Sequence, residues 1–371
     1  MRHHRDTASA ARNRNRGGNV RSPAPEDGPG HGPGPGAGSQ RRGRAARAVL
    51  AGATVLALAA VPACSSKAPG GDGASGGDKD EFVVGYSQAN NAEPYRAQLN
   101  LQLKYFAGKH RKLRLLPIAD AKQSSATQVS QVQNFIQQKV DVLIVSPNEP
   151  APLTPAVKQA CAARIPVIVL DRTVNTDCYT SFIGGDNYAI GKRAGERAVK
   201  ALPKGGKVAE LRGVLSAQPQ IERHRGFQDA LKGHGVEVVA HREAKWLRAN
   251  ATQIMQQWLQ RGTDIDLVYA HNDDMAIGAQ LAAESAGKAR GIRFLGIDGL
   301  AIPSGGIRAV QQRKLLATYL YPTAAKEAAR TAAAAASGKK VPKKQVLKTE
   351  EIMSGNAERV YERYDMSGKL G

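Results

Sequence analysis

Aromatic residues are scarce in this chain of 371 residues, at 5%, although its net charge of +21 is large. A strongly basic chain first suggests a nucleic-acid partner, bound by basic clusters interleaved with aromatic side chains. No such interleaving occurs, and beyond residue 80 no run of Lys or Arg exceeds two residues, as at Lys339-Lys340 and Lys343-Lys344. Residues 1–80 hold 12 Lys and Arg against 6 Asp and Glu. We therefore expect no nucleic-acid partner, and instead a basic exported protein that faces an anionic cell envelope.

Cysteine is also rare, with three residues, and no cluster of Cys and His has the spacing of a zinc site. The chain lacks an Asp-x-Asp-x-Asp-Gly calcium loop, and its Gly-rich segment at residues 30–38 is low in complexity rather than a phosphate-binding loop. His271 stands in no pattern of a catalytic triad. We expect no metal, no cofactor and no enzymatic activity.

A long apolar run is missing as well. Residues 48–61 form an apolar stretch of about 14 residues, which is too short to span a membrane comfortably. Four arginines between Arg41 and Arg47 precede it, and the small residue Ala63 follows it, so residues 41–63 have the pattern of a secretory signal peptide. Residues 1–40 are rich in Arg, Gly, Pro and Ser, and we expect a disordered extension because they bury too little apolar surface to offset the entropy of ordering.

The segment Val61-Pro-Ala-Cys64 resembles a bacterial lipobox, whose Cys is acylated and becomes the mature N-terminus. Residues 64–80 would then be a flexible tether, rich in Ser, Gly and Asp, which an acyl anchor on Cys64 holds at the outer face of the cell membrane. An ordinary cleaved signal followed by an incidental Cys is the alternative.

From Phe82 onward, predicted strands alternate with predicted helices, which indicates right-handed parallel βαβ units. The pattern restarts after residue 190, so we expect two α/β lobes of similar size. The expected strands are 82–87, 113–118, 140–146, 165–170, 181–185, 207–212, 236–240, 266–270, 292–297 and 316–321. The first expected helix ends at 106, the others are 126–139, 152–163, 191–202, 221–232, 249–260, 274–286 and 323–337, and a polar tail runs to Gly371.

The strand predicted at residues 165–170 is apolar throughout, as in a strand buried on both faces, and it ends abruptly at Asp171 and Arg172. Ligands of open α/β sheets lie just outside the carboxyl ends of the strands. A carboxylate beside a guanidinium group suits neighbouring sugar hydroxyls, each of which both donates and accepts a hydrogen bond. Taken alone, however, this pair could equally close a strand at the protein surface.

Six short motifs occur in the order found in one known family: Val84–Ser87, Leu170–Arg172, Gly185–Asn187, Arg223–Phe227, Tyr269–Ala279 and Gly296–Gly299. With these motifs the chain resembles, from Phe82 to about Tyr364, the sugar-binding proteins of bacterial ABC importers of the ribose/galactose type, and most of all the galactofuranose-binding type. The resemblance implies a type I periplasmic-binding-protein fold, with two doubly wound parallel-sheet lobes of α/β class joined by a hinge. It places the N-terminal lobe at 82–185 plus 322–350 and the C-terminal lobe at 186–321 plus 351–371.

The resemblance also implies ligand-binding roles for residues of both lobes. Trp246 takes the position of an aromatic ring that stacks on the sugar, and Tyr95 takes the position of a Trp in the galactofuranose type. Asp273 and Asp274 are interpreted instead as residues that complement the dipole at a helix N-terminus. The implied ligand-binding residues are Tyr95, Arg96, Asp171, Arg172, Arg223, Trp246, Asn272 and Asp298.

These residues leave the identity of the sugar open. The Gln or Glu that the family usually has at its hinge has no clear counterpart in residues 318–321. Three candidate arginines face only two candidate carboxylates, which could favour a sugar acid or phosphate over a neutral sugar. Furanose, pyranose and acidic sugars therefore all remain alternatives.

Two cysteines remain after Cys64. Cys161 lies near the end of a predicted helix and Cys178 just before a predicted strand, so both belong at the amino-terminal edge of the first sheet. The export compartment is oxidising, and a disulfide between them can form. Two free buried thiols are the alternative.

These features together predict a monomeric, lipid-anchored binding protein that captures a monosaccharide, such as galactofuranose or ribose, and delivers it to an ABC permease and its ATPase subunit. A receptor that presents a sugar or another small molecule to a membrane signalling partner is an alternative of a different class. A sugar-responsive transcription repressor shares the fold, but it would carry an N-terminal helix-turn-helix where the signal peptide stands.

Overall fold

The computed structural model describes residues 80–370 of the chain. The predicted extension, the signal peptide and the tether with Cys64 lie outside these residues, except for Asp80 at the end of the tether. Between residues 80 and 370, no helix is both long and apolar enough to cross a membrane.

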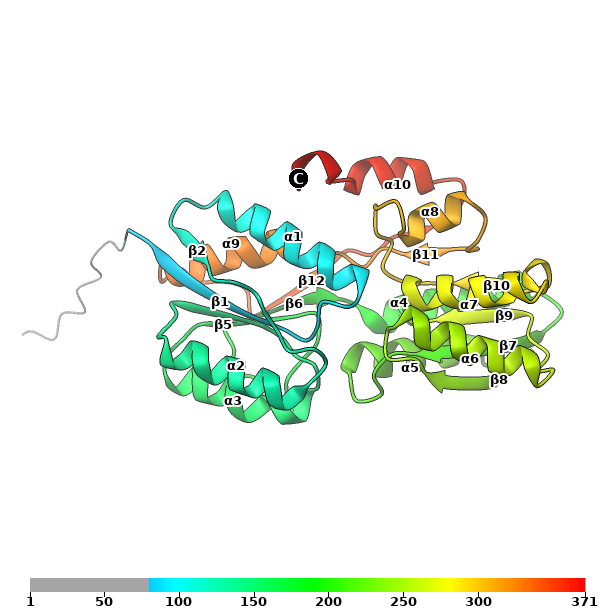
Figure 1. Cartoon of the computed structure of the whole chain (residues 1–371), viewed down its shortest axis with the longest axis horizontal. Helices are drawn as coiled ribbons and strands as arrows, with labels where there is room; N and C mark the ends of the chain where they lie inside the picture. The colour runs from blue at the N-terminus through cyan, green and yellow to red at the C-terminus, as the bar shows by residue number, and fades with distance from the viewer. Residues whose placement is uncertain (1–79, 371) are drawn as a thin grey trace, which may run out of the picture. The chain divides into compact units, whose positions relative to one another are not determined.

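The first lobe is built on a parallel sheet in the order β12-β6-β5-β4-β1-β2, with the short β3 beside β1. Helices α1 and α9 cover one face of this sheet, and α2 and α3 cover the other (Figure 1). The strands are β1 (Phe82–Gln88), β2 (Leu113–Leu115), β3 (Ala119–Asp120), β4 (Val142–Ser146), β5 (Val167–Leu170), β6 (Ser181–Gly185) and β12 (Lys344–Leu347). The helices are α1 (Pro94–Gly108), α2 (Ser125–Gln137), α3 (Pro150–Ala162) and α9 (Ala325–Ala336).

The second lobe has a parallel sheet in the order β10-β9-β7-β8. Side chains alternate between its faces: Val208 and Tyr269 pack with α4 and α5, whereas Ala209 and Val268 pack with α6 and α7. The strands are β7 (Gly206–Arg212), β8 (Val236–Glu243), β9 (Leu267–Ala270) and β10 (Arg293–Leu295), and the helices are α4 (Asn187–Ala201), α5 (Gln218–Leu231), α6 (Arg248–Gln260) and α7 (Asp273–Ser285). Both lobes are thus doubly wound, as predicted.

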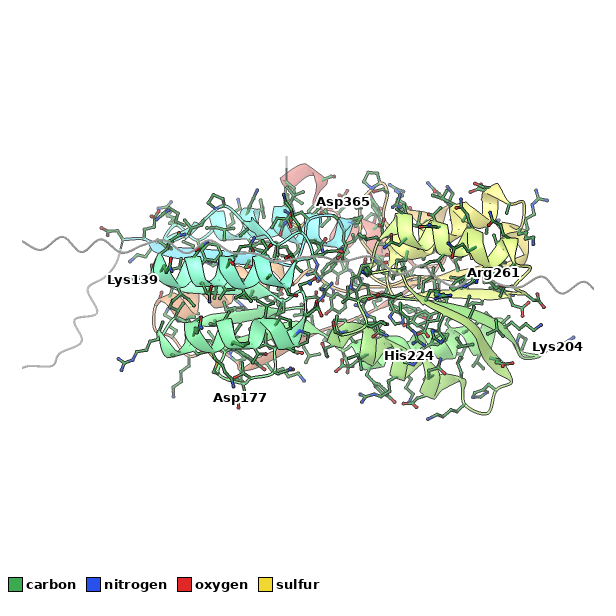
Figure 2. All side chains as sticks on the ribbon, turned by 60° about the horizontal axis from the view of Figure 1, so that its bottom comes forward. Lys139, Asp177, Lys204, His224, Arg261 and Asp365 are labelled. Carbon is green, nitrogen blue, oxygen red and sulfur yellow. A yellow bond between two sulfur atoms is a disulfide. The ribbon has the colours of Figure 1, made fainter. Side chains whose placement is uncertain are left out.

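The two sheets present their carboxyl ends toward each other. Lys139, just before β4, and Lys204, just before β7, mark the amino-terminal edges of the two sheets and lie on opposite sides of the view in Figure 2. Loops that follow the strands of one lobe therefore face loops that follow the strands of the other. This arrangement creates the space between the lobes where a ligand of such sheets is expected.

The prediction of a polar tail after residue 337 is wrong. β12 adds an edge strand to the first sheet, β13 (Glu351–Ile352) pairs antiparallel with β11 (Thr318–Tyr319), and α10 (Ala357–Tyr364) packs beside α8 (Gly306–Gln311). β12 is only half buried, and α10 buries only a narrow stripe that includes Val360 and Tyr361. Both segments are therefore mostly polar in sequence, and their polar composition does not indicate a strand or a helix. Helix α8 was also not predicted, and β10 and β11 are shorter than expected.

Candidate functional site

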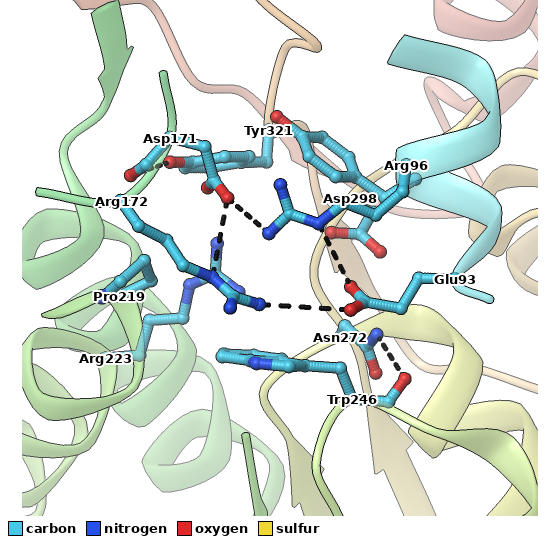
Figure 3. A pocket seen from close by; sticks show the side chains of 11 residues that line it. Glu93, Arg96, Asp171, Arg172, Pro219, Arg223, Trp246, Asn272, Asp298 and Tyr321 are labelled. Carbon is cyan, nitrogen blue, oxygen red and sulfur yellow. Dashed lines mark hydrogen bonds and ion pairs between the residues drawn. The ribbon is translucent and has the colours of Figure 1, made fainter. Parts of the chain in front are cut away.

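Four charged side chains of the first lobe form a closed ring of alternating sign (Figure 3). Arg96 Nη2 donates to Asp171 Oδ2 at 2.6 Å, and Arg96 Nε lies 3.8 Å from Glu93 Oε2. Arg172 completes the ring, with Nη2 3.9 Å from Glu93 Oε1 and Nε 3.7 Å from Asp171 Oδ2. All four side chains are buried, and each charge needs an opposite neighbour because an isolated charge is costly away from water.

The ends of β1, β4 and β5 position this ring. Arg96 lies in the first turn of α1, where its Nη1 donates to Ser146 Oγ at 2.6 Å and to Gln88 Oε1 at 3.1 Å. Arg172 Nη1 donates to Asn148 O at 3.0 Å. These bonds hold the guanidinium groups before any ligand arrives.

Burial and neighbouring charge act in opposite directions on the ring. Burial opposes ionisation of Asp171, but the guanidinium groups of Arg96 and Arg172 outweigh it and hold the pKa of that carboxyl below its usual value. Burial beside Arg96 lowers the pKa of Arg172 to about 10. Asp171 and Arg172 therefore keep their opposite charges at neutral pH.

The second lobe contributes Arg223 from α5. Its Nε donates to Asn187 Oδ1 at 2.9 Å and its Nη1 donates to the backbone oxygen of His271 at 2.5 Å. The guanidinium carbon lies 4.7 Å from the centre of the Tyr321 ring and 5.5 Å from that of Trp246. Arg223 is thus held by the second lobe beside Arg172 (Figure 3), where its charge also acts on Asp171.

Trp246 lies in the loop before α6, in the left-handed region at a φ of 70°. Its ring packs directly on the backbone of Gly213, where an added Cβ would stand 2.0 Å from Trp246 Cζ2. Asn272 caps α7 by accepting a hydrogen bond from Met275 N at 2.9 Å, and its amide donates to Trp246 O at 3.0 Å. Asn272 therefore holds the Trp246 backbone as well as starting a helix.

Asp298 follows β10 with a φ of 136°, and its carboxyl group accepts no hydrogen bond from residues 80–370. Burial, with a contribution from the charge of Asp273, raises the pKa of this carboxyl well above its usual value. Two buried donors of residues that line the same space also make no hydrogen bond within the described residues, namely Arg96 Nε, which has only the 3.8 Å ion pair with Glu93, and Trp246 Nε1. The site therefore offers both unsatisfied donors and an unsatisfied acceptor.

All eight side chains predicted for ligand binding line one pocket. Three further residues line it that were not predicted: Glu93, Pro219 and Tyr321. Glu93 could have been predicted from the sequence, because it is an acidic residue two positions before the predicted Tyr95-Arg96 pair. Tyr321 lies in the hinge stretch where a Gln or Glu was sought, so its aromatic ring was overlooked.

Asp273 and Asp274 occupy the first turn of α7, as interpreted from the sequence, and neither lines the pocket. Asp273 accepts hydrogen bonds from Gly299 N at 2.8 Å and Thr318 Oγ1 at 2.6 Å, and Asp274 pairs with Arg248. Within residues 80–370, no group of three or more His, Cys, Asp or Glu side chains is arranged to hold a metal ion.

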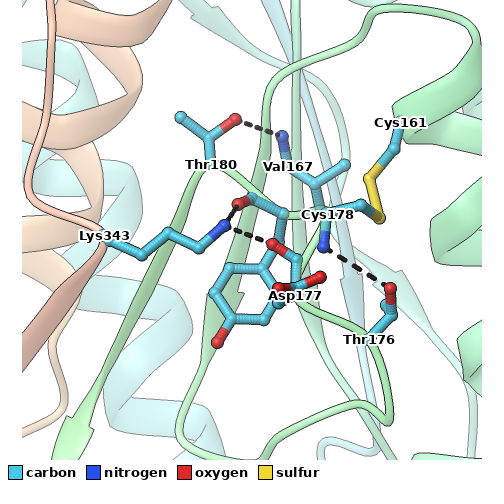
Figure 4. The surroundings of a disulfide bond; sticks show 8 residues. Cys161, Val167, Thr176, Asp177, Cys178, Thr180 and Lys343 are labelled. Atoms are coloured by element: carbon cyan, nitrogen blue, oxygen red, sulfur yellow. Dashed lines mark hydrogen bonds between the residues drawn. A yellow bond between two sulfur atoms is a disulfide. The ribbon is translucent and has the colours of Figure 1, made fainter.

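Cys161 and Cys178 form a disulfide in the structure, with their Cα atoms 6.1 Å apart (Figure 4). It joins the end of α3 to the loop before β6. Lys343 Nζ donates to the backbone oxygens of Asp177 and Tyr179 in the same loop. The loop is therefore tied to the sheet edge away from the pocket.

The family model described as a periplasmic binding protein domain matches residues 84–340. The chain belongs to the periplasmic binding protein family. The ribose import binding protein of Bacillus subtilis is 34% identical over 264 residues, which cover 71% of this chain and 84% of that protein. The galactofuranose-binding protein of Escherichia coli is 33% identical over 229 residues, covering 59% of this chain and 71% of that protein.

Solved structures of periplasmic binding proteins have the same fold. A fructose-binding periplasmic domain of a hybrid two-component system superposes with a TM-score of 0.74 at 33% identity, covering 78% of this chain and 96% of the other. A solute-binding protein of an ABC transporter from Bacillus halodurans, with bound myo-inositol, superposes with a TM-score of 0.73 at 31% identity and covers 78% and 100% of the two chains. The predicted family and the type I periplasmic-binding-protein fold are confirmed.

Proposed function

We propose that this periplasmic binding protein captures a neutral monosaccharide or a related polyol between its lobes and delivers it to an ABC permease. The observation that carries the proposal is the charge of the pocket. The sequence suggested three arginines against two carboxylates, but Glu93 adds a third acid, and in the ring of the first lobe Glu93 and Asp171 match Arg96 and Arg172 one to one. A ring whose charges already balance favours a ligand without net charge, whereas a sugar acid or phosphate would add a buried anion beside it.

Hydroxyl groups match the unsatisfied atoms of the pocket. A sugar hydroxyl can accept from Arg96 Nε or Trp246 Nε1 and can donate to the free carboxyl of Asp298. The rings of Tyr95, Trp246 and Tyr321 offer apolar faces to the C–H side of a sugar. The relatives support this chemistry, because their names specify ribose, galactofuranose and fructose, and one structure holds myo-inositol.

The proposal includes anchoring by an acyl group on Cys64 at the outer face of the membrane. Its support is the lipobox-like segment that ends at Cys64 and the polar residues that follow it. Expression of the full chain in its host should place the wild type in the membrane fraction and Cys64→Ala in the medium. Equal release of both proteins would contradict anchoring while leaving the binding function untouched.

The test of ligand class is calorimetric titration of the chain from residue 64 onward, with Cys64→Ser to prevent acylation. The titrants are neutral furanoses, neutral pyranoses, cyclic polyols and the corresponding sugar acids. We expect micromolar or tighter binding of one neutral ligand, lost in Asp171→Ala and retained in Asp177→Ala, which removes an exposed acid of the same lobe. Binding of sugar acids alone would overturn the proposed ligand class.

A sensing role is the second candidate, and one finding favours it. The fructose-binding domain with a TM-score of 0.74 belongs to a two-component signalling protein. Deletion of the gene separates the two functions: loss of sugar uptake supports import, whereas normal uptake with loss of a transcriptional response to the sugar supports sensing.

A further inference from the structure

A buried cluster of charge lies behind the second-lobe half of the pocket and does not touch it. Glu210 is at the centre of β7 and is fully buried. Its carboxylate accepts from His224 Nδ1 at 2.9 Å, His271 Nε2 at 2.9 Å, and Arg212 Nε and Nη2 at 2.9 and 2.7 Å. His224 lies toward the surface of the second lobe (Figure 2), whereas His271 is fully buried.

His271 connects this cluster to three residues that line the pocket. Its backbone oxygen accepts the 2.5 Å hydrogen bond from Arg223 Nη1. The next residue is Asn272, whose amide holds the backbone of Trp246 at 3.0 Å. The rings of His271 and Trp246 lie 6.3 Å apart. The hydrogen bond from the His271 ring to Glu210 therefore fixes His271 at the point of the backbone on which Arg223, Asn272 and Trp246 depend.

We infer that Glu210 and His271 are positioning residues for the second-lobe half of the ligand site. The inference rests on the proposed function, because it concerns affinity for the ligand of that site. Neither residue lines the pocket, and each acts through the backbone at residues 271 and 272. Groups that support ligand-binding side chains from behind set the geometry of the contact, and their loss from metal sites weakens binding by about 10- to 100-fold.

The protonation of the pair agrees with this role. Burial opposes ionisation of Glu210, but the hydrogen bonds from His224 and His271 outweigh it and lower the pKa of the carboxyl below its usual range. Burial lowers the pKa of His271 more than the hydrogen bond to Glu210 raises it, and Arg223 and Arg212 act in the same direction as burial. At neutral pH a neutral His271 thus donates Nε2–H to an ionised Glu210, while its Nδ1 has no partner among the described residues.

Stability alone does not account for this arrangement. Well-packed apolar residues of similar volume are often as stable as a buried ion pair, or more so. The cluster nevertheless places a carboxylate with four donors directly behind the residues that hold the ligand site. An apolar residue in place of Glu210 could not accept the hydrogen bond from His271 and so could not fix the orientation of its ring.

The test uses Glu210→Gln and His271→Gln in a Trp258→Phe background, which leaves Trp246 as the only tryptophan. The ligand is whichever neutral sugar binds the parent in the titration above. We expect Kd to rise about tenfold or more in both variants, and Trp246 fluorescence to change in wavelength or intensity even without ligand. Met255→Ala removes a buried side chain from the same lobe and should lower the melting temperature while Kd stays within about twofold.

Folded variants with an unchanged Kd and an unchanged Trp246 spectrum would overturn the inference. If neither variant folds, His224→Gln removes one donor from the partly exposed side of Glu210. It should then change the Trp246 spectrum, and an unchanged spectrum would count against positioning. If the parent binds no sugar, the proposed ligand class fails, but the ligand-free fluorescence still decides whether Glu210 and His271 orient Trp246.

Discussion

At the scale of single residues, three residues that line the pocket have backbone conformations that residues other than glycine seldom adopt. Asp171, Trp246 and Asp298 have φ values of 64°, 70° and 136°. Such conformations cost on the order of 1–3 kcal/mol each and persist only where the surroundings enforce them. Here the surroundings are the charge ring around Asp171 and the Asn272 hydrogen bond to Trp246. The site is therefore built before the ligand binds.

Glu93 should decide whether the pocket prefers a neutral or an anionic ligand. Glu93→Gln keeps the shape of the side chain but leaves Arg96 and Arg172 with one negative partner, Asp171. We expect affinity for the neutral sugar to fall about tenfold or more, because breaking a buried ion pair is costly, and affinity for the matching sugar acid to rise. Titration calorimetry measures both. Glu362→Gln, an exposed control with the same charge change, should alter neither, and an unchanged preference in Glu93→Gln would refute charge balance as the basis of selectivity.

Asp273 should make stability depend on pH. Burial, with a contribution from the charge of Asp274, raises the pKa of the Asp273 carboxyl, so the folded state binds a proton more readily than the unfolded state. Protonation of Asp273 therefore favours folding at low pH, and that contribution is lost as the pH rises through the folded-state pKa. Asp273→Asn removes it. Between about pH 5 and about pH 7.5, the free energy of unfolding of the variant should improve relative to wild type by about 1 kcal/mol, measured by urea titration. Parallel pH profiles of the two proteins would contradict this assignment.

At the scale of elements, helices α4 and α5 approach closely through glycines on both. A Cβ on Gly226 would lie 2.2 Å from Tyr188 O, and one on Gly191 would lie 2.1 Å from Arg223 O. This contact brings Asn187, at the start of α4, to the side chain of Arg223. Close helix packing thus sets the position of a residue that lines the pocket.

Gly226→Ala should therefore reduce both stability and ligand affinity. The added methyl group meets backbone atoms that cannot move aside singly, and overpacking of this kind costs about 1–3 kcal/mol. Gly108→Ala is the matched control, because a Cβ at the end of α1 meets nothing within 4 Å. Denaturant unfolding should show the control within about 0.5 kcal/mol of wild type. Equal stability of the two variants would show that the α4–α5 contact is looser than described.

The Cys161–Cys178 disulfide should stabilise the first lobe without affecting the ligand. It closes a loop with a sequence separation of 17, and chain entropy predicts a contribution of about 3 kcal/mol. Cys161→Ser combined with Cys178→Ser should lower the free energy of unfolding by that order while leaving Kd unchanged. A reducing agent should destabilise the wild type and not the double variant. A double variant as stable as the wild type would count against this loop-closure contribution.

At the scale of the whole molecule, the lobes meet at the mouth of the cleft as well as at the hinge. Ser216 Oγ of the second lobe donates to Glu149 Oε2 of the first lobe at 3.0 Å. Glu149 also accepts from Ser125 Oγ at 3.2 Å, so its carboxylate is held in place within its own lobe. A hydrogen bond between the lobes favours this arrangement over one in which the lobes separate, and it should therefore slow release of the ligand.

Ser216→Ala should accordingly speed ligand dissociation. One hydrogen bond contributes about 0.5–1.5 kcal/mol, so the dissociation rate should rise about two- to tenfold with little change in the association rate. Stopped-flow fluorescence of Trp246 can measure both rates. Ser285→Ala removes an exposed hydroxyl of α7 that bonds only within its helix and should leave the rates unchanged. Equal dissociation rates would show that the mouth bond does not bear on release.

Much of this molecule follows from its sequence alone. The alternation of apolar strands and amphipathic helices indicates two α/β lobes, because strand and helix periods are local properties of the chain. Asp171 and Arg172, which follow the strand at residues 167–170, line the pocket, because parallel strands bring their carboxyl ends to one edge. Local pattern and this one topological rule indicated these two residues, whereas the other six predicted lining residues were implied by the resemblance to the sugar-binding proteins of ABC importers.

Tertiary structure decided what depends on contacts between distant segments. Glu93 completes the ring of charges only because the start of α1 brings it within 4 Å of Arg172, 79 residues later in the chain. β12 begins at Lys344, 159 residues after the other strands of its sheet have ended at Gly185. Its residues are too polar for the sequence pattern to indicate a strand. His271 meets Glu210 across two neighbouring strands, 61 residues apart in sequence. No local pattern encodes such pairs, because each exists only once the strands and helices have packed together.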